Sequence, residues 1–177
     1  MMRMRHWLEK RAALTPQRAA LIGAGERMTF GELREQARAC AVRLAACGAA
    51  GGGRVAVLCR NGLHVPVIIH ALSYLGAVLV PMNTRLTIYE MAYQIRDAEC
   101  RTLIYDPAFE SFAAQLGERM TDLTCLRSDE LRNNEPAPHS ASPLTDELDA
   151  HALHSIMYTS GTTGQPKGVL LSYHNHW

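Results

Sequence analysis

Apolar residues along this chain occur in two patterns that alternate: short continuous runs and helical spacing. Residues 55–59 form a continuous apolar run, which is typical of a strand covered on both faces. Residues 31–47 place Leu33, Ala37 and Leu44 at helical spacing, which is typical of an amphipathic helix. Because the two patterns alternate from residue 55 to residue 126, we expect an α/β fold with a mostly parallel, doubly wound sheet and helices on both faces.

The same patterns predict the order of the elements. A helix at 7–14 precedes a hairpin of strands 19–22 and 28–30, and Thr87 and Glu90 have the spacing of a capping box at the start of a later helix. Glycine-rich residues 48–53 have the length of an ordinary loop, so we prefer a loop there to a domain linker. The remaining expected helices are 31–47, 63–75, 87–98 and 107–116, and the remaining strands are 55–59, 77–80, 102–105 and 123–126.

Residues 61–84 contain no Asp, Glu, Lys or Arg, and about 20 apolar residues suffice to cross a bilayer. Gly76 divides this stretch into a helix-like half and a strand-like half, which favours a buried helix followed by a buried strand. A membrane-associated protein that uses this stretch remains the alternative. His64 and His70 lie six residues apart on the expected helix, which is a poor spacing for two metal ligands on one face.

Residues 128–150 change composition to Asp, Glu, Asn, Ser and Pro and show no apolar periodicity. We interpret them as a long surface connection. Their acidic residues have no short spacing that gathers them at one point, so they indicate no cation site.

The chain has 177 residues, of which 47% are hydrophobic and 20% charged, as expected for one globular domain or part of one. Its net charge is +1 and its Lys and Arg residues do not cluster, which argues against a nucleic-acid-binding protein. The five cysteines are widely spaced and form no C-x-x-C pair, so we expect reduced thiols and a cytoplasmic protein. No continuous apolar stretch follows the basic start, which argues against a secretory signal.

Residues 159–168, Thr-Ser-Gly-Thr-Thr-Gly-Gln-Pro-Lys-Gly, have the strongest chemical character in the chain. Glycines let successive backbone amides point into one concavity, hydroxyl groups add donors for phosphate oxygens, and Lys167 adds positive charge. Apolar runs at 156–158 and 169–171 flank the segment, so we expect it to connect two buried strands. Composition alone also allows a flexible polar turn.

The spacing within this segment excludes two common nucleotide-binding loops. A P-loop requires Ser or Thr directly after its lysine and a helix behind it, whereas Lys167 is followed by Gly168 and an apolar run. The G-x-G-x-x-G fingerprint of dinucleotide-binding folds is absent from the chain.

The order of residues 159–168 resembles the phosphate-binding signature of the adenylate-forming superfamily, which comprises acyl- and aryl-CoA synthetases, peptide-synthetase adenylation domains and luciferases. Residues 28–33, 53–61 and 75–78 also look like segments of that superfamily. Further similarity to its acyl-CoA synthetase branch lies at Pro81, Asn83, Arg85 and Leu86. Within that branch, the chain is most similar to the o-succinylbenzoate-CoA ligase family at residues 7–18, 157–158 and 175–176.

The resemblance implies a two-step reaction. A carboxylate attacks the α-phosphorus of ATP to give an acyl-adenylate and pyrophosphate, and the thiolate of coenzyme A then attacks to give an acyl-CoA thioester. The implied substrate is o-succinylbenzoate, converted to o-succinylbenzoyl-CoA in menaquinone biosynthesis. Two alternatives stay open: a fatty-acyl- or aryl-CoA synthetase, and a non-catalytic module that binds nucleotide phosphates.

The resemblance also implies which residues contact ATP, with Mg²⁺ and coenzyme A as further participants. Lys167 is the expected catalytic residue, as a mobile counter-charge on the β- and γ-phosphates. Mg²⁺ would bridge phosphate oxygens, but the sequence does not indicate its protein ligands. His174 and His176 form an H-x-H pair without a third ligand at useful spacing, so we expect no metal there. The expected phosphate-binding residues are Thr159, Ser160, Gly161, Thr162, Thr163, Gly164 and Lys167.

Members of the superfamily continue far beyond the position of Trp177. The resemblance therefore implies that residues 1–177 correspond to the N-terminal portion of the large adenylate-forming domain, with 128–150 as a surface connection and 159–168 as the phosphate-binding loop. It also implies that the small C-terminal domain has no counterpart here and that this chain alone is inactive.

Overall fold

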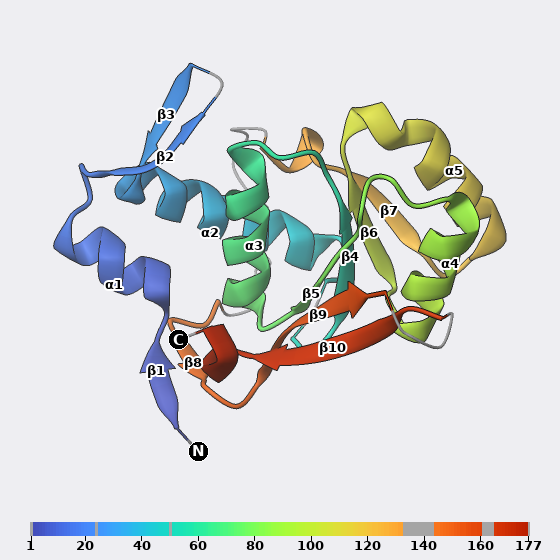
Figure 1. Cartoon of the computed structure of the whole chain (residues 1–177). Coiled ribbons are helices and arrows are strands. Elements are labelled where there is room, and N and C mark those ends of the chain that lie inside the picture. The colour runs from blue at the N-terminus through green and yellow to red at the C-terminus, as the bar shows by residue number, and fades with distance from the viewer. Residues whose placement is uncertain (1, 24, 50, 133–143, 161–164, 177) are drawn as a thin grey trace.

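A computed structural model describes residues 2–23, 25–49, 51–132, 144–160 and 165–176 of the chain. Its centre is a sheet with the strand order β10-β9-β5-β4-β6-β7 (Figure 1). Neighbouring strands are parallel except β9 and β10, which are antiparallel. This arrangement confirms the expected mostly parallel α/β sheet. The strands are β4 (Arg54–Leu58), β5 (Val78–Pro81), β6 (Thr102–Tyr105), β7 (Thr124–Arg127), β9 (Leu153–Thr159) and β10 (Lys167–Ser172).

Helices cover both faces of this sheet. Successive side chains of a strand point to opposite faces, and in the central strands both sets are apolar and buried. On β4, Val55 and Val57 pack into a core with α2 (Phe30–Ala46) and α3 (His64–Leu75). Ala56 and Leu58 pack into a second core with α4 (Ile88–Asp97) and α5 (Glu110–Arg119). The continuous apolar run at 55–58 is therefore explained by burial on both sides.

The strand order reverses beside β4. The chain leaves β4 through α3 to reach β5 on one side, and it returns through α4 to β6 on the other side. The helices that follow β4 and β6 therefore pack on opposite faces of the sheet. Where two neighbouring connections diverge in this way, the carboxyl ends of the parallel strands border a crevice that is a common ligand site.

Most of the predicted elements are present. The opening helix is α1 (Trp7–Leu14), and the hairpin consists of β2 (Ala19–Gly23) and β3 (Glu26–Thr29). The capping box of α4 is confirmed, because the Thr87 amide donates to the Glu90 carboxylate at 2.7 Å and the Glu90 amide donates to the Thr87 hydroxyl at 3.4 Å.

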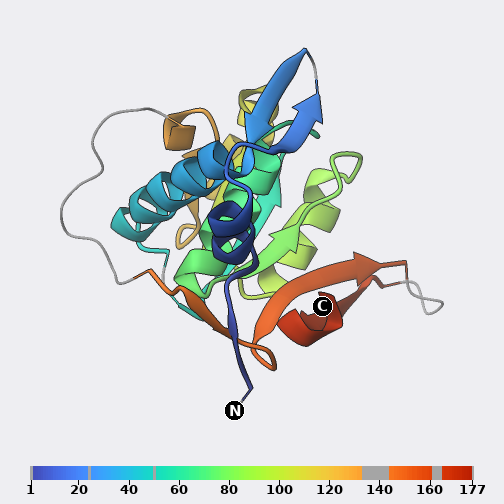
Figure 2. The same cartoon turned by 90° about the vertical axis from the view of Figure 1, so that its left-hand side faces the viewer.

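A third antiparallel pair, separate from the β2–β3 hairpin and the β9–β10 pair, was not predicted. The strand β1 (Arg3–Arg5) pairs with β8 (Glu147–Asp149), which lies inside the expected surface connection 128–150 (Figure 2). A short 3₁₀ helix, η2 (Glu130–Arg132), lies in the same stretch. Leu131 and Leu148 are only 5% and 3% exposed, so the described ends of this connection contribute to the core and are not simply surface. Residues 133–143 lie outside the described residues.

Residues 61–84 form α3 and β5 with short connections, as the preferred interpretation of that stretch predicted. Gly76 ends α3 in the left-handed conformation, with φ of 65°. Among the helices that the structure describes, none combines the length and apolarity needed to cross a membrane.

Candidate functional site

The predicted phosphate loop connects the two strands of a β-hairpin. Lys167 opens β10 and lies opposite Thr159, the last residue of β9, so the two ends of the loop meet at the end of the hairpin. Thr159, Ser160 and Lys167 are exposed. The other predicted phosphate-binding residues lie outside the described residues, namely Gly161, Thr162, Thr163 and Gly164.

The two strands of this hairpin differ in burial. Residues 154–156 of β9 are buried, as predicted, because β9 pairs with β5 on one side and β10 on the other. The expectation that β10 is also buried is wrong: Val169 is 43% exposed and Leu170 is 63% exposed. Within the described part of the chain, β10 pairs only with β9, so its outer edge is unpaired there.

Residues of α4 contact the loop end of the hairpin. The Tyr93 hydroxyl donates to the backbone oxygen of Pro166 at 3.4 Å, just before Lys167. The Tyr158 hydroxyl donates to the Asp97 carboxylate and contacts the Gln94 backbone oxygen at 3.3 Å. Burial and the Asp97 carboxylate both raise the pKa of Tyr158, which keeps it a neutral donor. Sequence reasoning missed these supporting residues, because they are ordinary aromatic and polar positions on a helix and a strand.

Gly168 lies opposite Tyr158 in the β9–β10 pair, where there is little room for a side chain. A Cβ atom at this position would lie 2.8 Å from Cγ2 of Ile156 and 3.3 Å from Cζ of Tyr158. We expect Gly168→Ala to displace Tyr158 and to lower the free energy of unfolding by about 1–3 kcal/mol, the range typical of overpacking. Urea unfolding measures this loss.

Gly117→Ala on α5 is the matched control for Gly168→Ala. An added Cβ at Gly117 would meet only the Cys125 sulfur, at an ordinary 3.9 Å, and alanine stabilises a helix interior relative to glycine. We therefore expect equal or higher stability for this variant. Equal stability of Gly168→Ala and the unmodified chain would contradict the tight contact.

One group of three potential metal ligands lies together in the part of the chain that the structure describes: Cys59, His64 and Asp106. None of them was predicted as a ligand, and His64 was expected not to be one. His174 and His176 do not belong to this group. Their rings pack against His151 and His154, with centroids 5.9 and 4.5 Å apart.

The fold and the hairpin loop agree with the family to which the sequence can be assigned. The AMP-binding enzyme family matches residues 8–177, and the chain belongs to that family. The 2-succinylbenzoate–CoA ligases of Bacillus thuringiensis subsp. konkukian and Bacillus anthracis are each 40% identical to it over 174 residues. These matches cover 98% of this chain and 34% of each ligase, so the chain spans about a third of the length of these relatives.

Solved structures with the same fold include the o-succinylbenzoate CoA synthetase (MenE) of Bacillus subtilis. Its complex with the acyl-adenylate intermediate OSB-AMP has a TM-score of 0.90 and 34% identity, covering 99% of this chain and 35% of that chain. Its complex with ATP and magnesium has a TM-score of 0.88 and 32% identity, covering 99% and 45%. The N-terminal domain of FACL13 from Mycobacterium tuberculosis has a TM-score of 0.83 and 29% identity, covering 96% and 45%. The predicted superfamily resemblance is thereby confirmed.

Proposed function

We propose that this chain is part of an AMP-forming acid–thiol ligase that converts 2-succinylbenzoate, through its acyl-adenylate, to the coenzyme A thioester used in menaquinone biosynthesis. The observation that carries the proposal is the 40% identity to ligases of that name over 98% of the chain. The placement of the Thr-Ser-Gly-Thr-Thr-Gly-Gln-Pro-Lys-Gly segment between β9 and β10 supports it.

In the proposed site, residues 159–164 donate hydrogen bonds to the phosphates of ATP through Thr159, Ser160, Thr162 and Thr163 and through the amides of Gly161 and Gly164. Lys167 balances the charge that develops on the departing pyrophosphate. The register of the hairpin supports this division of roles, because it brings Lys167 to the strand position opposite Thr159. When bound, Mg²⁺ would neutralise and bridge phosphate oxygens.

We further propose that residues 1–177 correspond to the N-terminal portion of the large adenylate-forming domain, with 159–168 as its phosphate-binding loop. The match to about a third of each relative's length supports this assignment. The acid pocket, the coenzyme A site and the small C-terminal domain then belong to the part of the enzyme outside these residues, and the chain alone is inactive. A cytoplasmic location is part of the proposal, supported by five cysteines that are all free thiols.

ATP–pyrophosphate exchange by the complete enzyme tests the proposed substrate. We expect exchange to depend on added acid and to be fastest with 2-succinylbenzoate, compared with benzoate and a straight-chain fatty acid at equal concentration. Addition of coenzyme A should then give the 2-succinylbenzoyl thioester. Faster exchange with the fatty acid or with benzoate would favour a different acyl-CoA synthetase. ATP binding without exchange for any acid would favour a non-catalytic phosphate-binding module.

A further inference from the structure

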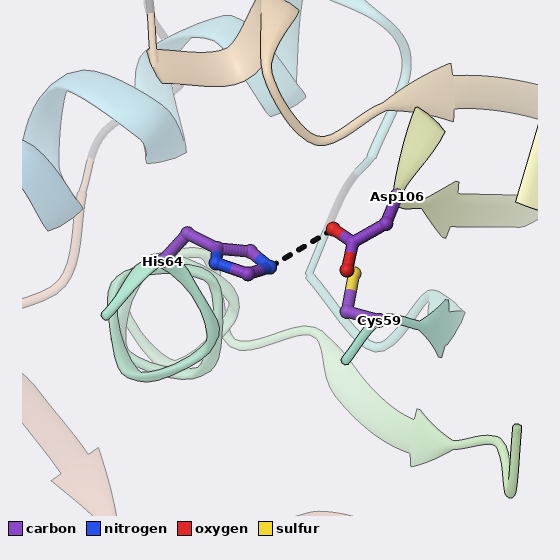
Figure 3. A group of neighbouring side chains, drawn as sticks. All are labelled: Cys59, His64 and Asp106. Carbon is purple, nitrogen blue, oxygen red and sulfur yellow. Dashed lines mark ion pairs between the residues drawn. The ribbon is translucent and has the colours of Figure 1, made fainter. Parts of the chain in front are cut away.

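A thiol, an imidazole and a carboxylate meet at the reversal point of the sheet, on a different pair of strands from the phosphate loop. Cys59 directly follows β4, and Asp106 directly follows β6. These two strands are parallel neighbours, and the order of strands in the sheet reverses between them. His64 is the first residue of α3, which leaves the same end of β4. Figure 3 shows the three side chains turned toward one another from these three elements.

The three potential ligand atoms lie within 4.8 Å of one another. Nε2 of His64 is 2.9 Å from Oδ1 of Asp106, and their side chains are only 16% and 12% exposed. Despite this short distance, the buried Nε2 atom makes no hydrogen bond of suitable geometry with the described residues. The imidazole therefore approaches the carboxylate without the alignment of an ordinary histidine–aspartate hydrogen bond.

The Asp106 carboxylate is held in position by its other neighbours. The buried Ser128 hydroxyl donates to Oδ1 at 2.6 Å, and the Arg60 amide donates to Oδ2 at 2.7 Å. A carboxylate oriented by outer hydrogen bonds is the usual arrangement of a metal ligand.

Gly62 allows the imidazole to occupy this place. A Cβ atom at Gly62 would lie 2.7 Å from Nδ1 of His64 and 2.8 Å from Cε1. Any side chain here would push the ring away from its present position. Gly62 therefore positions His64 without itself offering a ligand atom.

The environment of Cys59 disfavours a role as a nucleophile. Burial, followed by the negative charge of Asp106, raises the pKa of the Cys59 thiol. A reactive cysteine needs surroundings that lower this pKa, such as a nearby cation.

We propose that Cys59, His64 and Asp106 bind one divalent transition-metal ion, with Zn²⁺ as the best match to the ligand set. Thiolate, imidazole and carboxylate are the three ligand types that zinc accepts, and a hard cation such as Mg²⁺ would not select the sulfur. Bonds of about 2.0–2.3 Å to a tetrahedral zinc ion place ligand atoms about 3.3–3.6 Å apart. The observed spacing requires only small side-chain movements, and the thiol proton is released to solvent on binding.

Three protein ligands leave a fourth position for water or another ligand. His64 also lines a surface cavity of about 500 Å³ between the β2–β3 hairpin and the turn at residues 61–63. The ion would join the ends of β4 and β6 to the start of α3. Its role is therefore to stabilise this edge of the sheet, independently of the proposed adenylation chemistry.

Cobalt substitution tests the site in the purified, chelator-treated protein. We expect one Co²⁺ ion per chain, a near-ultraviolet thiolate-to-cobalt band and a visible spectrum of tetrahedral Co²⁺, all abolished by one equivalent of Zn²⁺. Cys59→Ser should lose the thiolate band. Cys47→Ser, which changes an exposed thiol just after α2, should keep it.

Gly62→Ala is the decisive variant, because it leaves all three ligands in place. We expect it to weaken Zn²⁺ binding about 10–100-fold in calorimetric titration, the range seen when residues that orient a metal ligand are changed. Asp106→Asn should weaken binding at least as much, and circular dichroism establishes that each variant is folded.

Two results would overturn the metal site. The first is absence of zinc binding at micromolar concentration by the unmodified protein. The second is a cobalt spectrum that survives Cys59→Ser and Gly62→Ala but disappears in a His174→Ala, His176→Ala double variant, which would assign the ion to exposed histidines. Neither result bears on pyrophosphate exchange, so failure here is distinguishable from failure of the proposed function.

Discussion

Lys167→Ala is expected to lower acid-dependent ATP–pyrophosphate exchange by the complete enzyme by about 10²-fold, the usual effect of removing one hydrogen-bond donor from a developing negative charge. Pyrophosphate carries more localised negative charge as it departs than it does within ATP, so the ammonium group stabilises the transition state more than the bound substrate. Lys167 is exposed at the start of β10 and lies opposite Thr159, at the base of the proposed phosphate loop.

The chain offers a matched control, because Lys10 is its only other lysine. Lys10 lies on α1, away from the loop end of the β9–β10 hairpin in Figure 1, so Lys10→Ala should leave exchange within about twofold of the unmodified rate. Lys167→Arg should recover part of the lost rate, because the positive charge remains while the shape of the donor changes. Unchanged exchange in Lys167→Ala would remove this residue from the catalytic set.

Loss of exchange in Lys167→Ala must be separated from loss of structure. Since the Lys167 side chain is exposed, its removal should change the free energy of unfolding by no more than about 0.5 kcal/mol. A normal urea unfolding transition together with the lower exchange rate assigns the effect to chemistry.

Local patterns predicted most of the large elements of the fold. The strand at 102–105 was predicted with the bounds that the structure shows, because all four of its residues are buried and form a continuous run between turns. The capping box at Thr87 and Glu90 also requires only neighbours in sequence, so it could be recognised without the fold. Patterns of this kind can be recognised in the sequence because they do not depend on distant partners.

Pairing between distant segments could not be predicted in the same way. The strand β1 has three residues, and its partner β8 is more than 140 residues away within a polar stretch, so neither carries a readable alternation. Exposure of β10 follows from its place at the edge of the described sheet, which its apolar sequence does not reveal.

The grouping of Cys59, His64 and Asp106 shows the same limit for a site. Spacing along one helix argued against His64 and His70 as a ligand pair, but it could not reveal partners of His64 on other elements. One signal was available: Cys59 and Asp106 each follow a predicted buried strand directly. Carboxyl ends of parallel strands share one edge of a sheet, so the two residues were candidates for proximity once the strands were known to be neighbours.

Acidification from about pH 7 to pH 5 is expected to lower the free energy of unfolding steeply, because three largely buried histidines must stay neutral in the folded state. Burial is the main cause of the low pKa in each case. It lowers the pKa of His6 to about 3 and those of His70 and His154 to about 4. Histidine in the unfolded chain has a pKa of about 6.5, so the unfolded state binds protons that the folded state excludes.

The sign of the effect follows from these values. Stability from the neutral imidazoles is fully present above about pH 6.5 and is lost as the pH falls toward the folded-state values. Each histidine contributes a slope of up to about 1.4 kcal/mol per pH unit in this window. His70, Arg38 and His154 lower the pKa of His6 further, and Asp146 partly opposes them. Because all three imidazoles stay neutral in the folded state within this window, their slopes add.

His6→Asn isolates one of these groups. Nδ1 of His6 accepts the Leu8 amide at 3.2 Å as the cap of α1, and asparagine is a preferred residue at that position. The variant also loses the stacking of His6 on Tyr74, with ring centroids 4.0 Å apart, so we expect it to be less stable at pH 7. Between about pH 6.5 and pH 5, however, its stability should fall with a slope that is smaller by up to about 1.4 kcal/mol per pH unit.

Urea unfolding at several pH values measures these slopes, with His151→Gln as the control, because His151 is exposed and its removal should leave the slope unchanged. Identical slopes for His6→Asn and the unmodified protein would contradict a neutral, buried His6. A shallower slope for both variants would instead indicate that protonation of exposed histidines governs the acid response. The comparison therefore locates the acid sensitivity in the packing of α1 against α3, where His6 meets His70 and Tyr74.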